Sequence, residues 1–148
     1  MRGLWMFFIF LGLGFNSLVF SQNHVSWNAK YDKESCQLVI HGTIDPSWHL
    51  YSPKTKGSLG PIPLSAQITA TDGIKPKGSV RYLTEAQAHQ DENFGGMVYT
   101  WENTVELSQK LSVKQSGEIK ITLNYMVCDE TRCLPPIDKT WTLNIHNE

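Results

Sequence analysis

The stretch GEIKITLNYMVCDETRCLPP, residues 117–136, decides the fold. Between residues 119 and 127, apolar side chains occupy every second position, with mostly polar side chains between them. Successive side chains of a β-strand point to opposite faces, so this period of two predicts a half-buried strand. Cys128 continues the polar face and is therefore expected to point outward.

The same stretch places Cys128 and Cys133 on either side of four residues, 129–132. If these four form a hairpin loop, the two cysteines face each other at a Cα separation of about 5.5 Å, which disulfide geometry accepts. We therefore expect a bridge between them, redox-active or structural, on an outward hairpin face. The third cysteine, Cys36, would then be free. Its parity with Leu38 and Ile40 predicts a position facing the core, and an intermolecular disulfide is the alternative.

The rest of the chain alternates in the same way. Further segments with the period of a strand are 25–29, 38–40, 48–50, 64–70, 80–82, 98–101, 105–107 and 141–145. Turn-forming residues separate them, for example Thr71-Asp72-Gly73 and Pro76-Lys77-Gly78. No segment has a capped 3.6-residue stripe, although residues 84–90 are compatible with one helical turn. Eight or nine short strands predict an all-β, immunoglobulin-like antiparallel β-sandwich, and a β-barrel would give a similar pattern.

The N-terminus has the pattern of a secretory signal peptide. Arg2 precedes an apolar run over residues 4–19, and Ser21 precedes the expected cut before Gln22. The run is shorter than the roughly 20 residues of a spanning helix, which favours cleavage over an anchor. We expect residues 1–21 to be the signal and 22–148 to form one exported domain, in a compartment where disulfides form.

The charge balance excludes some classes of partner. There are 13 Lys and Arg residues against 14 Asp and Glu residues, which gives no electrostatic case for binding nucleic acid or an anionic membrane. The five histidines match no metal-ligand spacing, so no metal is expected. The sequence calls for no cofactor, and any contact with the membrane is expected only through a partner.

Three motifs together carry a resemblance to a known family. They are DPSWHLYS at residues 45–52, GPIP at 60–63, and the segment from Cys128 to Cys133 that continues as Leu134-Pro135-Pro136. In order and spacing the chain resembles the N-terminal domain of the thiol:disulfide interchange protein DsbD, over residues 25–145. The resemblance implies an immunoglobulin-like domain in the periplasm that accepts electrons from a thioredoxin-like domain and passes them to oxidised envelope proteins.

By this resemblance Cys128 and Cys133 are the redox pair, and Cys133 is the thiol that bonds to partners. The chain ends at Glu148, so we expect it to act alone, without the membrane conduit and thioredoxin-like domain of full DsbD. That leaves the electron donor open. The cysteine loop is one residue shorter than in some members, which would alter the redox potential.

The resemblance also suggests side chains that line the site. If Trp48 and Leu50 enter the core, His49 and Tyr51 share the opposite face and flank the sulfurs. An ordinary surface strand is the alternative. The segment DENFGGM at residues 91–97 matches a cap loop in which Phe94 shields the disulfide, with Asp91 and Glu92 beside it; an ordinary hairpin loop would have the same composition.

Local charges point to Cys133 as the nucleophile without any reference to the family. Arg132 beside it favours a thiolate, whereas Asp129 and Glu130 beside Cys128 disfavour one. The sequence therefore leaves two functions from different classes. One is an exported thiol-disulfide relay that acts as a protein-disulfide reductase. The other is a non-catalytic, protein-binding sandwich with a structural disulfide.

Overall fold

The computed structural model describes residues 23–55, 60–92 and 94–147, and it consists of β-strands joined by turns. The expected signal segment lies outside the described residues. The strands are β1 (Val25–Asp32), β2 (Gln37–Ile44), β3 (His49–Tyr51), β4 (Ser65–Ala70), β5 (Ile74–Tyr82), β6 (Gln87–Asp91), β7 (Gly96–Glu102), β8 (Thr104–Val113), β9 (Gly117–Tyr125), β10 (Val127–Cys128) and β11 (Ile137–Ile145). No helix in this described part is long and apolar enough to cross a membrane.

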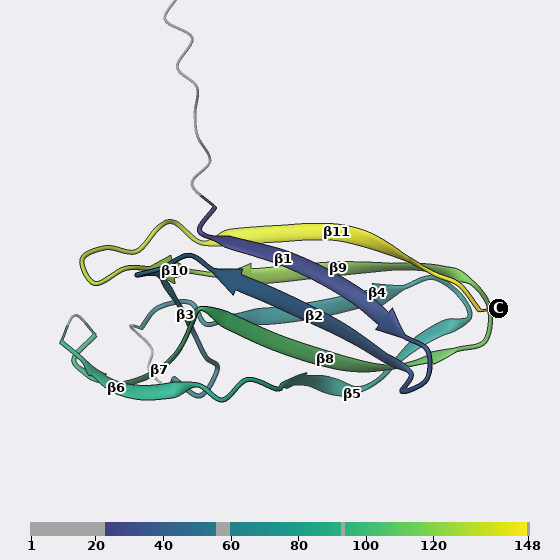
Figure 1. Cartoon of the computed structure of the whole chain (residues 1–148), viewed down its shortest axis with the longest axis horizontal. Helices are drawn as coiled ribbons and strands as arrows, with labels where there is room; N and C mark the ends of the chain where they lie inside the picture. Colours follow the sequence, from purple (N-terminus) through teal and green to yellow (C-terminus); the bar gives the residue numbers. More distant parts are fainter. Residues whose placement is uncertain (1–22, 56–59, 93, 148) are drawn as a thin grey trace, which may run out of the picture.

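The strands form three antiparallel sheets. Their orders are β1-β2-β8-β5, β11-β9-β4 and β10-β3-β7-β6. The first two make the layers of an elongated sandwich, and the third occupies one end of its long axis, opposite the C-terminus (Figure 1). This arrangement confirms the predicted all-β, immunoglobulin-like antiparallel sandwich.

The core lies between the two long sheets. Leu38, Ile40 and Leu107 from one layer, and Ile121 and Leu123 from the other, are completely buried. These residues occupy alternate positions of their strands, as the period of two predicts. Burying each such side chain contributes about 1.5–3 kcal/mol, so the layers are held together mainly by this interior.

Two strands of the end sheet, β7 and β10, are each one residue away from a core strand. β7 and β8 are separated only by Asn103, whose φ is +61°, and β9 and β10 only by Met126. At Met126 the backbone N–H donates to the carbonyl oxygen of Ile62, at 3.2 Å, instead of continuing the β9 ladder. β10 then pairs with β3, which fixes Cys128 beside His49. The long core strands thus hold the cysteine region at one end of the molecule.

Three local expectations are wrong. The strand predicted over residues 119–127 breaks at Met126, because β10 joins a different sheet. Residues 84–90 form no helical turn: the segment 87–91 is β6, and pairing with β7 overrides its weak local preference. The turn predicted at residues 76–78 lies inside β5, where the register with β8 shifts between Lys77 and Arg81.

Candidate functional site

Cys128 and Cys133 form a disulfide at the end of the molecule that carries the third sheet. Cys128 ends β10, and Cys133 faces it as an isolated antiparallel bridge across the cysteine loop, residues 129–132. The bond closes the hairpin that the spacing predicts. Beyond it, the N–H of Leu134 donates to the carbonyl oxygen of Val127 at 2.9 Å, so the chain leaves the hairpin still paired.

The two sulfurs differ sharply in exposure. Cys133 is exposed. Cys128 is only 1% exposed and packs in a small apolar cluster with Tyr51 and Val98. The expectation that both cysteines point outward is therefore wrong for Cys128. The face on which it lies is polar along β9, but beyond Met126 this face is packed with Tyr51, Val98 and Phe94. An incoming thiol meets the Cys133 side of the bond first.

Asp129 orders the cysteine loop. Its Oδ1 accepts hydrogen bonds from the backbone N–H and the hydroxyl of Thr131 and from the N–H of Arg132, each at 2.8 Å. These bonds, led by the Thr131 N–H, lower the pKa of Asp129 to about 2. The carboxylate therefore stays charged at physiological pH and caps the turn between the two cysteines.

Arg132 precedes Cys133 in the sequence, and its side chain contacts Asp129 and Trp48. Its Nε lies 3.5 Å from Asp129 Oδ2, and its guanidinium carbon lies 5.7 Å from the centroid of the Trp48 ring. Trp48 in turn stacks on His24 with ring centroids 3.8 Å apart. The positive charge expected to assist Cys133 is thus partly offset by Asp129.

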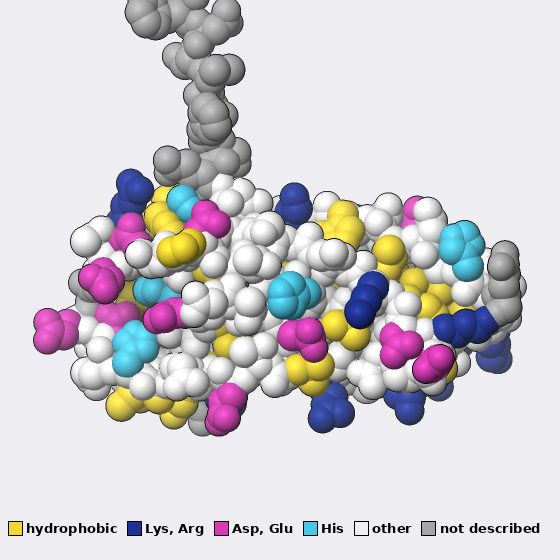
Figure 2. Space-filling view, in the orientation of Figure 1, with side chains coloured by type: hydrophobic (Ala, Val, Ile, Leu, Met, Phe, Trp, Pro, Cys, Tyr) yellow, Lys and Arg dark blue, Asp and Glu magenta, His cyan; other side chains and the backbone are white. Residues whose placement is uncertain are grey.

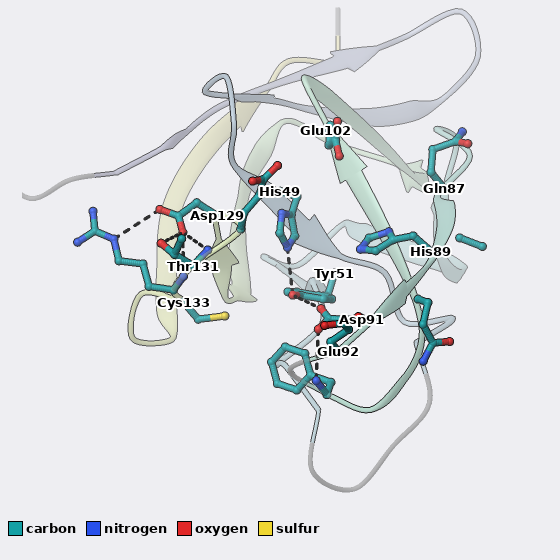
Figure 3. A pocket seen from close by; sticks show the side chains of 15 residues that line it. His49, Tyr51, Gln87, His89, Asp91, Glu92, Glu102, Asp129, Thr131 and Cys133 are labelled. Carbon is teal, nitrogen blue, oxygen red and sulfur yellow. Dashed lines mark hydrogen bonds and ion pairs between the residues drawn. The ribbon is translucent and has the colours of Figure 1, made fainter.

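His49, Tyr51 and Asp91 form a hydrogen-bonded chain beside the disulfide (Figure 3). The Tyr51 hydroxyl donates to Asp91 Oδ2 at 3.3 Å and lies 3.0 Å from His49 Nε2. Burial, and then the charge of Asp91, raise the pKa of Tyr51, so this hydroxyl keeps its proton. Because that hydrogen is donated to Asp91, the Tyr51 oxygen is left to accept one from His49.

The imidazole of His49 is held largely neutral. Its burial, with repulsion from His89 next in size, lowers the pKa of His49. Glu102, which pairs with His49 across β3 and β7, opposes that shift, as do Asp91 and Asp129. A neutral ring can donate from Nε2 to Tyr51 while the other nitrogen carries no hydrogen.

Phe94 closes the site from the β6–β7 side. In the cap loop, of which residues 92, 94 and 95 are described, the N–H of Phe94 donates to Oδ1 of Asp91, the last residue of β6, at 3.2 Å. The Phe94 ring meets the Tyr51 ring edge to face, with centroids 5.8 Å apart, and packs on the apolar cluster that contains Cys128. Gly95 has a φ of +65°, a conformation that favours glycine and lets the chain turn tightly behind Phe94.

These elements enclose a pocket of about 730 Å³. Its lining comes from β3, β6, the cap loop, the end of β7 and the cysteine loop, and the Cys133 sulfur points toward this shared space (Figure 3). Of the residues proposed from sequence, the structure brings His49, Tyr51, Asp91, Glu92, Phe94 and Cys133 to the pocket, while Cys128 lies behind it.

Sequence reasoning missed His89 and Glu102 as lining residues. Glu102 reaches the pocket because β7 pairs with β3, and that register cannot be read from either segment alone. His89 was assigned to the expected helical turn. The alternation of Gln87, His89 and Asp91 along one face is the signal that could have revealed β6.

Cys36 is not part of this site, and the prediction that it faces the core is wrong. It is free and exposed, in the turn between β1 and β2, with a φ of +54°. β2 begins only at Gln37, so the parity of Leu38 and Ile40 does not extend to Cys36. Among the described residues, no group of three or more His, Cys, Asp or Glu side chains is placed to hold a metal ion.

A comparison with protein-family models decides the relationship. The model "Thiol:disulfide interchange protein DsbD, N-terminal" matches residues 18–145. The chain belongs to this family. The match confirms the resemblance based on the motifs at residues 45–52, 60–63 and 128–136. A search of curated protein sequences gave no match.

Solved DsbD N-terminal domains have the same fold. The reduced domain from Neisseria meningitidis is 15% identical, with a TM-score of 0.61 over 89% of this chain and 94% of that chain. The complex between the DsbD and PilB N-terminal domains of the same organism is 15% identical, with a TM-score of 0.62 over 88% of this chain and 94% of that chain. The N-terminal periplasmic domain of ScsB from Proteus mirabilis is 16% identical, with a TM-score of 0.56 over 83% of this chain and 46% of that chain.

Proposed function

We propose that this DsbD N-terminal domain relays reducing equivalents between proteins through Cys128 and Cys133. The observation that carries the proposal is the asymmetric disulfide at the pocket: one sulfur exposed to a partner, the other buried behind it. Thiol-disulfide exchange needs one sulfur that a partner's thiolate can reach and a second that can leave and later return. Membership of the DsbD N-terminal family supports the same chemistry.

In the first half of the cycle the protein is reduced. A thiolate of the donor attacks Cys133 Sγ, the bond between Cys133 and Cys128 breaks, and Cys128 leaves as a thiolate. The donor's second thiol then attacks its own sulfur in the mixed disulfide. This releases Cys133 as a thiolate and leaves the donor oxidised. Two electrons and the accompanying protons pass to the pair, and no prosthetic group takes part.

In the second half the protein reduces its substrate. The Cys133 thiolate attacks a disulfide of the acceptor protein and forms a mixed disulfide, which frees one acceptor thiol. Cys128 then attacks Cys133 Sγ, restores the internal disulfide and frees the second acceptor thiol. Phe94 covers the pair between these encounters, because its ring packs on the cluster that holds Cys128.

The proposed partners are thioredoxin-like proteins or domains as donors and oxidised envelope proteins as acceptors, in the periplasm. The complex of a DsbD N-terminal domain with the PilB N-terminal domain supports docking of another protein domain. The ScsB domain, described as periplasmic, supports the compartment. The signal-like residues 1–21 support export, and contact with the membrane is proposed only through a partner.

A protein-binding sandwich with a structural disulfide is the competing function. Closing so short a loop constrains the unfolded chain by only about 2 kcal/mol in the loop-entropy model. Asp129 already orders this loop through three hydrogen bonds, which leaves less for a disulfide to contribute. The open pocket beside Cys133 also favours exchange over a structural role.

The reduction potential of the pair separates the two functions. We expect a value above about −300 mV, in the range of exchange proteins, because structural disulfides in secreted proteins lie below that value. Purified Cys36→Ser protein would be equilibrated in dithiothreitol and glutathione redox buffers, and the remaining thiols counted by alkylation and mass spectrometry. A potential well below −300 mV would favour the structural disulfide.

A further inference from the structure

The pocket beside Cys133 is strongly acidic. Five of the described residues that line it carry carboxylates, Asp91, Glu92, Glu102, Asp129 and Glu130, against one guanidinium, that of Arg132. Figure 2 shows acidic side chains gathered at this end of the molecule, while most lysines and arginines visible on this face lie toward the other end. On this face the acidic side chains beside the pocket thus lie apart from most of the basic ones, although the chain as a whole is near-neutral.

Three of these carboxylates form no hydrogen bond or ion pair within the described part of the chain. Asp129 caps the cysteine loop and Asp91 binds Tyr51, but the exposed side chains of Glu92, Glu102 and Glu130 make no hydrogen bond or ion pair with another described residue. They come from three separate elements: the cap loop, the end of β7 and the cysteine loop. Their shared feature is that they line the pocket into which the Cys133 sulfur points.

We propose that this acidic rim selects partner proteins whose reactive cysteine is surrounded by net positive charge. The inference rests on the proposed relay and adds the chemistry of the partner to it. A cleft lined by charge of one sign attracts the opposite sign over roughly a Debye length, about 8 Å at physiological ionic strength, and raises association rates by about 10- to 1,000-fold. A cationic partner is steered to Cys133, and an anionic one is repelled.

The same charges couple docking to chemistry. Carboxylates around Cys133 disfavour its thiolate, which is the reactive form. A docked cationic rim offsets that field at the moment of attack, whereas a neutral or anionic partner does not. The acidic rim therefore slows exchange with unsuitable thiols and disulfides while leaving exchange with a basic partner fast.

Small disulfides of different charge test this selection without a named partner. Reduced Cys36→Ser protein would be mixed with cystamine, a dication; 2-hydroxyethyl disulfide, neutral; and 3,3′-dithiodipropionate, a dianion. In each reaction the protein dithiol becomes a disulfide and the probe becomes two thiols. The oxidation of the protein is measured by mass spectrometry after acid quenching. The rate ratio of cystamine to dithiodipropionate is divided by the same ratio for N-acetylcysteine methylamide, a neutral thiol. Within one variant the thiolate fraction then cancels.

We expect a normalised ratio of about ten or more at 10 mM ionic strength that falls toward one at 1 M NaCl. The variant Glu92→Gln, Glu102→Gln, Glu130→Gln should lose most of the preference. A matched variant at the opposite end, Glu34→Gln, Asp72→Asn, Glu118→Gln, makes the same change in net charge and should keep it.

Each outcome has a definite consequence. If all three probes react at equal normalised rates that salt does not change, the pair exchanges thiols but the acidic rim selects nothing, so the inference is overturned and the relay stands. If none of the probes oxidises the pair, the proposed relay itself fails. Should the triple variant not fold, the salt dependence of the parent protein decides the question alone.

Discussion

The variant Cys128→Ala is expected to accumulate mixed disulfides in the native envelope, about tenfold more than Cys133→Ala. In exchange, Cys133 attacks the partner and Cys128 resolves the complex, so removing Cys128 strands the adduct. Cys133→Ala leaves only Cys128, which is 1% exposed and packed against Tyr51 and Val98. A partner disulfide cannot reach that sulfur in line.

The comparison is made on non-reducing gels, with both variants in a Cys36→Ser background, because Cys36 is a free and exposed thiol. Adducts that disappear with dithiothreitol would be excised and their partners identified by mass spectrometry. A structural disulfide predicts a different pattern: each variant loses about 2 kcal/mol of stability and neither forms a specific adduct. Equal trapping by both variants would contradict the assignment of roles to the two cysteines.

Replacing Phe94 by alanine is expected to speed reduction of the disulfide by dithiothreitol about fivefold. Phe94 is half-buried, and burying half of such a ring stabilises the closed cap by about 1 kcal/mol. Losing that contribution raises the population of the open cap by about the stated factor, while a core phenylalanine would cost about 3–5 kcal/mol of global stability.

The measurement pairs the reduction rate with a denaturant melt. Met97→Ala is the matched control: Met97 is 52% exposed near the same loop and is not among the residues that pack on the Cys128 cluster. We expect its reduction rate to equal that of the parent. If Phe94→Ala also leaves the rate unchanged, the loop at residues 92–95 is an ordinary hairpin turn and Phe94 has no capping role.

Sequence periodicity predicted the sandwich because its core depends on strict alternation. Ile119, Ile121 and Leu123 are completely buried, and they alternate with polar residues along β9. Such a pattern is independent of which strand lies next to which. The disulfide was also predictable from the sequence, because a four-residue hairpin loop makes its flanking residues face each other.

The details at the end sheet depend on tertiary pairing and were not predictable. Val127 and Cys128 are both buried because β10 leaves the β9 sheet and joins β3. Alternation alone cannot show a strand changing sheets, so the burial of Cys128 was not predicted. In the same way, β6 has an exposed, polar sequence, and only its pairing with β7 makes it a strand.

Site residues that lie together on one strand were predicted from the sequence, whereas residues brought to the site by the pairing of different strands were missed. His49 and Tyr51 lie two residues apart on β3, so their shared face followed from the sequence, and their side chains are 3.0 Å apart. Glu102 and His89 reach the same pocket from β7 and β6. The acidic character of the pocket therefore became visible only when the three strands were placed side by side.

The redox state of Cys128 and Cys133 inside the native envelope tests the central claim most directly. Cells expressing Cys36→Ser protein would be quenched in acid and their free thiols alkylated with a reagent that shifts the mass by a fixed amount per thiol. A relay that turns over is expected to show both the dithiol and the disulfide form, with the disulfide form increasing when cells lose their thioredoxin-like donors. A pair that is fully oxidised under every condition would contradict the relay and identify the bridge as structural.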